Sequence, residues 1–167
     1  MTKTHKITFL SITTVFALVL SYVEMLIPPI FSSIPGIKIG LPNIIIIFLL
    51  YKFSFKEAAI VSLMRIALSS LLFGNIMIMF YSVCGAVLSL LLMHIFKKFN
   101  LFSTIGVSII GGIAHNLGQI IAAIIVTETI KIGYYMMVLS ISGTIAGAIV
   151  GIAGAFLIKS SQKIKFV

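Results

Sequence analysis

The chain is a succession of long apolar runs separated by short polar connections. A helix needs about 20 apolar residues to cross the ~30 Å hydrocarbon layer of a membrane. Lipid offers no hydrogen-bond partners to the backbone, so such runs form helices that satisfy their own backbone groups. The pattern predicts an all-α membrane protein, a bundle of six transmembrane helices in one domain over residues 1–167. The predicted spans are residues 7–27, 41–53, 56–73, 76–96, 104–126 and 134–158.

Composition agrees with this class of protein. Apolar residues make up 60% of the chain and charged residues 9%, against about 45–50% and about 25% in soluble proteins. The span 41–53 is short, because about 13 residues at ~1.5 Å each cover roughly 20 Å. We expect it to be tilted, to be extended by Ile37 and Ile39, or to begin below the membrane surface.

The lysines predict the orientation in the membrane. If the six spans alternate in direction, one side of the membrane has only Lys38 and Lys131. The other side collects Lys3, Lys6, Lys52, Lys56, Lys97, Lys98, Lys159, Lys163 and Lys165. The positive-inside rule then places both termini in the cytoplasm of a multi-pass cell-membrane protein. Contact with anionic lipid head groups explains the net charge of +9 better than nucleic-acid binding does.

A polar cluster interrupts the apolar span 104–126. His115, Asn116 and Gln119 lie at its centre, at a depth where hydrocarbon offers no partners. His115 and Gln119 are four residues apart and share a helix face, whereas Asn116 is turned by about 100°. Any one of them could only hydrogen-bond a neighbouring helix. Three within five positions favour a ligand-binding role.

Arg65 is the second polar landmark and the sole arginine of the chain. It lies near the middle of the span 56–73, where a guanidinium is costly unless it is paired. Two acids could pair with it, Glu57 two turns below on its own helix and Glu24 near the outer end of the first helix. Glu57 lies at the cytoplasmic edge near lysines, so Glu24 is the expected partner if the first and third helices touch. Alternatively, the planar fork of Arg65 binds a carboxylate or phosphate of a ligand. The pair with Glu24 and the binding of a ligand are compatible if the ligand competes with Glu24 for Arg65.

Further polar residues are expected at the outer ends of the helices. Asn43 and Asn75 lie near the external ends of the second and third spans and would form a polar rim together with Glu24. Asn75 follows Gly74, so its alternative role is to form a turn.

The external connection 28–40 is apolar and contains prolines and glycines. It is expected either to cover a cavity as a lid or to rest on the lipid interface. The predicted substrate-binding residues below it are Glu24, Asn43, Arg65, His115, Asn116 and Gln119.

Small residues recur at every fourth position in two spans, which permits close contact between helices. The stripe in the last span is Gly143, Gly147, Gly151 and Ala155, and the stripe in the first span is Thr13, Ala17 and Ser21. Packing inside the bundle is the commoner explanation, above all for the glycines. The first-span stripe is alternatively a docking face for another subunit.

The residue types argue against catalysis. The chain has no aspartate, and its three acids are Glu24, Glu57 and Glu128. It has no phosphate-binding loop and no nucleophile elbow. A single histidine in the polar cluster lacks the ligand count of a metal site. We therefore predict no enzyme activity, no metal and no cofactor, so active transport would need an ion gradient or the ATPase of a partner.

Several of these segments together resemble the Gx transporter family, also labelled heptaprenyl diphosphate synthase component I. They are Glu24 to Pro28, Gly36-Ile37-Lys38-Ile39-Gly40-Leu41-Pro42-Asn43, Arg65 with Ser70-Leu71-Leu72-Phe73-Gly74, and Gly111-Gly112-Ile113-Ala114-His115-Asn116-Leu117-Gly118-Gln119. The layout is similar to that of the substrate-binding S components of energy-coupling factor vitamin transporters. That likeness implies an outward-facing pocket, and docking through Thr13, Ala17 and Ser21 to a T-type transmembrane subunit with two ATPases.

The preferred hypothesis is an S-component-like membrane subunit that binds or transports a small anionic or amphipathic solute taken from outside. The alternative follows from the synthase label. It is an accessory membrane subunit in polyprenyl diphosphate or quinone biosynthesis, beside a soluble polyprenyl diphosphate synthase. A third hypothesis is an interaction protein in which the polar cluster only joins helices.

Overall fold

The computed structural model describes residues 3–27 and 39–163, and within these ranges the chain is helical with no β-strand. The all-helical class is thereby confirmed, and each predicted span coincides with one α-helix. The α-helices are α1 Lys3–Leu26, α2 Asn43–Lys52, α3 Phe55–Phe73, α4 Ile76–Phe99, α5 Thr104–Thr127 and α6 Met136–Ser160. Two 3-10 helices, η1 Ile130–Tyr135 and η2 Ser161–Lys163, flank α6.

Among the described residues, four segments are long and apolar enough to cross a membrane, namely α1, α4, α5 and the segment Ile130–Ser160 that contains α6. Their length and composition support a membrane protein. α2 has only ten residues, or about 15 Å. Of the three alternatives for this short span, an extension through Ile39 is not found, because Leu41 and Pro42 form a turn and the helix begins at Asn43; Ile37 lies outside the described residues.

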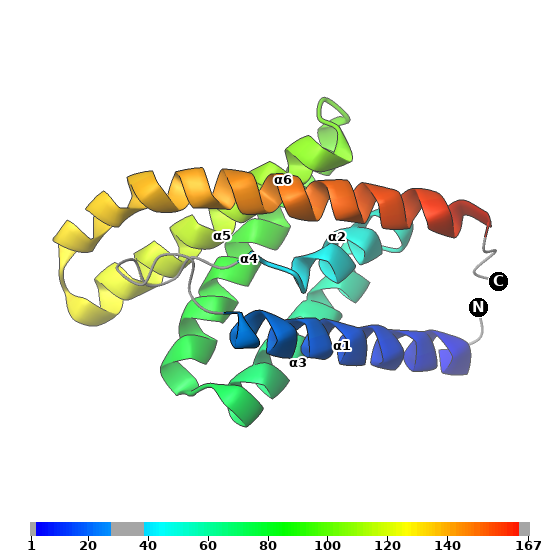
Figure 1. Cartoon of the computed structure of the whole chain (residues 1–167), viewed down its shortest axis with the longest axis horizontal. Coiled ribbons are helices and arrows are strands. Elements are labelled where there is room, and N and C mark those ends of the chain that lie inside the picture. Colours follow the sequence, from blue (N-terminus) through cyan, green and yellow to red (C-terminus); the bar gives the residue numbers. More distant parts are fainter. Residues whose placement is uncertain (1–2, 28–38, 164–167) are drawn as a thin grey trace.

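The longest helices set the shape of the molecule. In Figure 1, α1 and α6 run along its long axis, and α1 begins at the same end of the molecule at which α6 ends. α5 packs against both α4 and α6, α1 packs mainly against α3, and α2 is held by α3 and α6. The condition for a contact between Arg65 and Glu24, that the first and third helices touch, is therefore met.

Polar caps explain where three helices begin. The side chain of Ser54 accepts the Lys56 N–H at the start of α3, and Ser103 accepts the Gly106 N–H at the start of α5, both at 3.2 Å. Asn75 accepts the Ile78 N–H at 2.9 Å and caps α4. These bonds satisfy N–H groups that a helix leaves open in its first turn. Asn75 therefore acts locally, at the turn between α3 and α4. This turn role was the predicted alternative to a place in the polar rim.

α2 is the buried centre of the bundle. Five consecutive residues, Ile46 to Leu50, are buried, which means that α2 is covered on all sides. Lys97 of α4 donates from Nζ to the Leu50 carbonyl oxygen at 2.5 Å, and its Nζ lies 5.1 Å from the centroid of the Tyr51 ring. A buried half-length helix must have its last carbonyl groups satisfied by another part of the chain. Lys97 does this for the carbonyl group of Leu50.

The glycine stripe of α6 packs inside the bundle, as expected. A Cβ atom on Gly147 would lie 2.7 Å from the Ile109 Cα, and one on Gly151 would lie 2.8 Å from the Ile105 Cα. Both contacts are with the backbone of α5, so only glycine lets the two helices approach this closely.

The stripe of α1 is also largely internal. Thr13 is 7% exposed and Ala17 is 0% exposed, and Ser21 lines the cavity described below. The Thr13 hydroxyl donates to carbonyl groups of its own helix. These residues pack within the chain, in agreement with the commoner explanation, and their role as a docking face stays a prediction.

Candidate ligand-binding cavity

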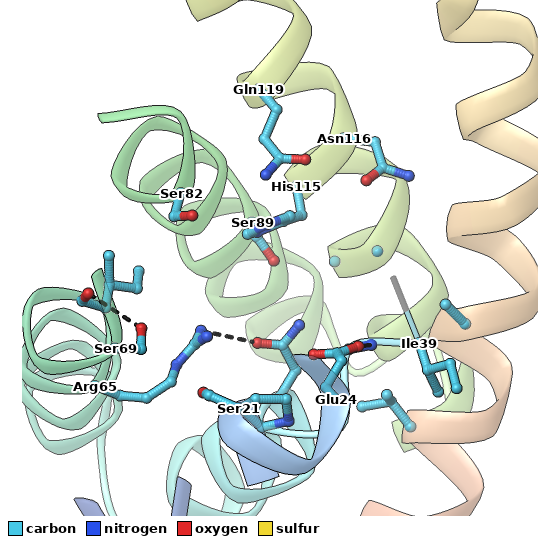
Figure 2. Close-up of a pocket in the computed structure, with 18 of the residues that line it drawn as sticks. Ser21, Glu24, Ile39, Arg65, Ser69, Ser82, Ser89, His115, Asn116 and Gln119 are labelled. Atoms are coloured by element: carbon cyan, nitrogen blue, oxygen red, sulfur yellow. Dashed lines mark hydrogen bonds between the residues drawn. The ribbon is translucent and has the colours of Figure 1, made fainter. Parts of the chain in front are cut away.

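One cavity of about 390 Å³ lies between the helices, within the common size range of small-molecule sites. All six residues predicted to bind substrate line it, namely Glu24, Asn43, Arg65, His115, Asn116 and Gln119. They come from α1, α2, α3 and α5. Figure 2 shows Arg65 and Glu24 on one side and His115 and Gln119 on the other. Their part in binding remains a prediction.

Arg65 reaches the cavity from α3 and is half-buried. Its Nη2 donates to Asn43 Oδ1 at 3.4 Å, a long bond that is drawn in Figure 2. Its Nε is buried and has no hydrogen-bond partner in the described part of the chain. The guanidinium thus has donors in place for an acceptor that the described residues do not supply.

A direct Arg65–Glu24 ion pair, the expected partner arrangement, is absent. Within residues 3–27 and 39–163 an ion pair joins Lys6 to Glu57, which lies about two turns before Arg65 on α3. The Glu24 carboxylate instead accepts the backbone N–H of Gly40. Glu24 remains close enough to act electrostatically on Arg65. The expected direct pair is wrong for the described chain, because the packing of α1 on α3 leaves the two groups within electrostatic range but not in contact, while Glu24 accepts a backbone N–H.

Gly40 makes this arrangement possible. Its φ is +79°, a conformation that residues with a side chain rarely adopt. A Cβ atom there would also lie 3.2 Å from Asn43 Nδ2. Gly40 therefore holds Glu24 and Asn43 at one corner of the cavity. The proposed lid, 28–40, lies outside the described residues except for Ile39 and Gly40, which line the cavity.

The polar cluster of α5 divides into two parts. Asn116 Nδ2 donates to the Leu139 carbonyl oxygen of α6 at 2.6 Å, which is the helix-joining role. His115 and Gln119 lie over Gly85 of α4, where a Cβ atom would be 3.0 Å from Gln119 Cγ. Within the described chain the Gln119 side chain makes no hydrogen bond to protein, so its amide remains available at the cavity wall.

Several serines that the sequence alone did not single out line the same cavity. Ser82 and Ser89 lie on α4, and Ser108 lies on α5. Ser82 and Ser89 are seven residues apart, two helical turns, with Gly85 between them on the same face. That spacing was the available signal, but a serine in an apolar helix often bonds only its own backbone. Apolar walls complete the cavity, among them Ile47, Ile66, Phe73 and Val150.

The chemistry of the wall suits binding. One carboxylate, one guanidinium, amides and hydroxyl groups face a space with apolar sides. Among the residues that the structure describes, no three His, Cys, Asp or Glu side chains come together in a way that could hold a metal ion.

Comparison with known proteins identifies the family. No curated protein and no solved structure matches the chain. A family model described as heptaprenyl diphosphate synthase component I matches residues 13–157. This confirms the family resemblance under its second label and does not test the similarity to S components. The match includes every residue that lines the cavity, from Ser21 to Val150. The chain belongs to the heptaprenyl diphosphate synthase component I family.

Proposed function

We propose that the protein is a membrane-embedded binding subunit whose cavity holds a small anionic or amphipathic molecule. The observation that carries this proposal is the buried Nε of Arg65, which has no hydrogen-bond partner among the described residues. Leaving a buried donor open costs about 1–3 kcal/mol, and more for a charged group. A carboxylate or phosphate oxygen in the cavity would remove this cost, because the guanidinium fork matches such groups.

The proposed topology has six membrane spans in a single domain, with both termini in the cytoplasm. The distribution of lysines supports it. The position of the start of α1 and the end of α6 at one end of the molecule agrees with it (Figure 1). Glu24 and Gly40, near the other end of α1, would then lie toward the outside, and the cavity would take up its molecule from there.

The family description favours an accessory role in polyprenyl diphosphate or quinone biosynthesis, because it names one component of a synthase. Magnesium–diphosphate chemistry uses carboxylates to hold the metal ion, and this chain has no aspartate. The catalytic step would therefore belong to a soluble polyprenyl diphosphate synthase. The membrane subunit would hold or present an isoprenoid or quinone precursor.

Transport is the second candidate. A cavity at membrane depth with polar groups from four helices is suited to the capture of a solute. Like an S component, the protein would bind a solute from outside and would act with a T-type subunit and two ATPases. Without them it would need an ion gradient.

The binding proposal is tested by identifying what the purified protein retains. Mass spectrometry of extracts from the wild-type protein should find a small molecule that the Arg65→Gln variant lacks. Lys131→Gln, which removes an exposed positive charge outside the cavity, is the control and should retain the molecule. Equal content in the wild type and in a monodisperse Arg65→Gln variant would contradict the assignment.

The two roles differ in the partner that they require. Purification in a gentle detergent from the native membrane, followed by quantitative proteomics, tests both roles together. Enrichment of a polyprenyl diphosphate synthase supports the biosynthetic role. Enrichment of a T-type subunit and ATPases supports transport and contradicts the biosynthetic role.

A further inference from the structure

We infer that the molecule held in the cavity is a zwitterion, with an anionic group that faces Arg65 and a cationic group that faces Glu24. The inference rests on the proposed function, because it takes the cavity as a binding site. It adds the chemical class of the bound molecule and separates it from a multiply charged anion such as a diphosphate.

The first argument is the charge balance of the wall. Among the described residues that line the cavity, Glu24 carries the one negative charge and Arg65 the one positive charge, with histidine counted as neutral. Charges interact strongly where the local dielectric constant is low. A multiply charged anion would be repelled by Glu24 and would leave net negative charge buried. A molecule with one charge of each sign leaves the cavity neutral.

The second argument is that the two wall charges do not neutralise each other directly. No contact of 4 Å or less joins the Arg65 guanidinium to a carboxylate in the described chain. The one described partner of Arg65 is the neutral Asn43, and its Nε remains open. Glu24 accepts from the Gly40 N–H through Oε1. A carboxylate can accept about four hydrogen bonds, so Glu24 retains capacity for a cationic donor.

The third argument is the position of these groups. Figure 2 shows the Arg65 and Glu24 side chains entering the same side of the cavity from different helices. The remaining wall is formed partly by apolar side chains such as Ile66 and Phe73. A compact molecule with both charged groups at one end and an apolar body would satisfy this arrangement.

Four probes test the inference on the purified full chain by isothermal titration calorimetry. L-Phenylalanine carries both charges, 3-phenylpropanoate carries only the carboxylate, and 2-phenylethylamine carries only the ammonium group. Inorganic diphosphate represents the multiply charged anion. We expect L-phenylalanine to bind at least about tenfold more tightly than either singly charged probe, and diphosphate to bind more weakly than all three.

Glu24→Gln isolates the charge of Glu24, because the amide oxygen of glutamine can still accept the Gly40 N–H. We expect L-phenylalanine affinity to fall about 10- to 100-fold, to the level of 3-phenylpropanoate. Glu128→Gln removes an exposed acid outside the cavity and should change nothing. Arg65→Lys keeps a positive charge without the fork and should weaken both carboxylate probes. Size-exclusion profiles of the variants establish that they are folded.

Three results would overturn the zwitterion and leave the proposed function standing. They are equal affinity for L-phenylalanine and 3-phenylpropanoate, tighter binding of diphosphate, and an unchanged preference in Glu24→Gln. Binding of none of the four probes would overturn it as well. The proposed function fails separately, if the wild-type protein and Arg65→Gln retain the same molecules after purification.

Discussion

Arg65 shows what the type of a residue and its place in an apolar span can predict. A single arginine in an apolar span is expensive to bury, so its presence predicts a partner or a ligand. Its described partner, Asn43, belongs to the predicted site, but the favoured partner, Glu24, binds the Gly40 N–H instead. A sequence shows which side chains carry charge. It does not show which backbone N–H groups those side chains contact after the chain turns, and here Glu24 accepts the Gly40 N–H while the Nε of Arg65 has no partner in the described chain.

Asn43→Asp should close this open position. The substitution is nearly isosteric and places a carboxylate where Asn43 Oδ1 now meets Arg65 Nη2 at 3.4 Å. The new charge pair would compete with an anionic group of the ligand. We expect the retained small molecule to fall about tenfold or more, measured by mass spectrometry of the purified protein.

The matched control is Asn75→Asp, the same change at a residue that caps α4 and does not line the cavity. An aspartate caps a helix about as well as an asparagine, so this variant should retain the wild-type amount. Undiminished content in Asn43→Asp would show that the Arg65–Asn43 corner does not contact the bound molecule.

Among the helices, α2 departs most from what a membrane span requires. Its ten residues cross about half of the hydrocarbon layer, yet five in a row are buried. The short apolar run was visible in the sequence, but its surroundings were not. Burial by α3 and α6 and the capping lysine from α4 come from segments far away in the chain. The end of α2 therefore depends on a contact across 47 positions.

Lys97→Met should destabilise this end of α2. It removes the donor to the Leu50 carbonyl oxygen and keeps a side chain of similar length. A buried carbonyl group left without its partner costs about 1–3 kcal/mol. We expect a lower thermal midpoint in detergent, by about 2–12 °C for a chain of this size. Lys98→Met changes the adjacent, exposed lysine and should leave the midpoint within error; an equal loss in both variants would refute the capping role.

The contact between α5 and α6 depends on glycines that have no room for a side chain. Gly147→Ala would put a Cβ atom 2.7 Å from the Ile109 Cα, so the two helix backbones must separate. Overpacking of this kind costs about 1–3 kcal/mol. Gly133→Ala is the control, because its nearest neighbour would be a side-chain atom at 3.8 Å. Thermal denaturation followed by size-exclusion chromatography should give a lower midpoint for Gly147→Ala than for Gly133→Ala. Equal midpoints would contradict the close contact between α5 and α6.

For the whole molecule, the lysine distribution predicts that both termini are cytoplasmic. Cys84 is the one cysteine of the sequence, so a Cys84→Ser background permits single-cysteine labelling. Lys131→Cys places a thiol at an exposed position before the start of α6, and Gln162→Cys places one at an exposed position after its end. In intact cells, a membrane-impermeant maleimide should label Lys131→Cys at once and Gln162→Cys only after permeabilisation. The reverse order would invert the proposed topology and direct the cavity toward the cytoplasm.

The limits of helix α3, the cap at Asn75 and the membrane class follow from local features of the sequence. Hydrophobic length, small polar caps and turn residues act over a few positions, so they can be recognised without the fold. The six candidate site residues were also found this way, since a polar side chain in an apolar span is conspicuous wherever it points. The serines of the cavity wall were missed because a hydroxyl group is only mildly unfavourable there.

Local rules do not determine how the helices rotate and meet. The division of the polar cluster into Asn116, which joins α5 to α6, and Gln119, which faces the cavity, depends on which helix packs on which face. The same holds for the internal place of Thr13 and Ala17. The sequence therefore established a helical membrane protein with costly polar groups in its spans. The packing of distant segments assembled those groups into one cavity and kept Glu24 and Arg65 apart, because backbone contacts across the bundle set the position of each side chain.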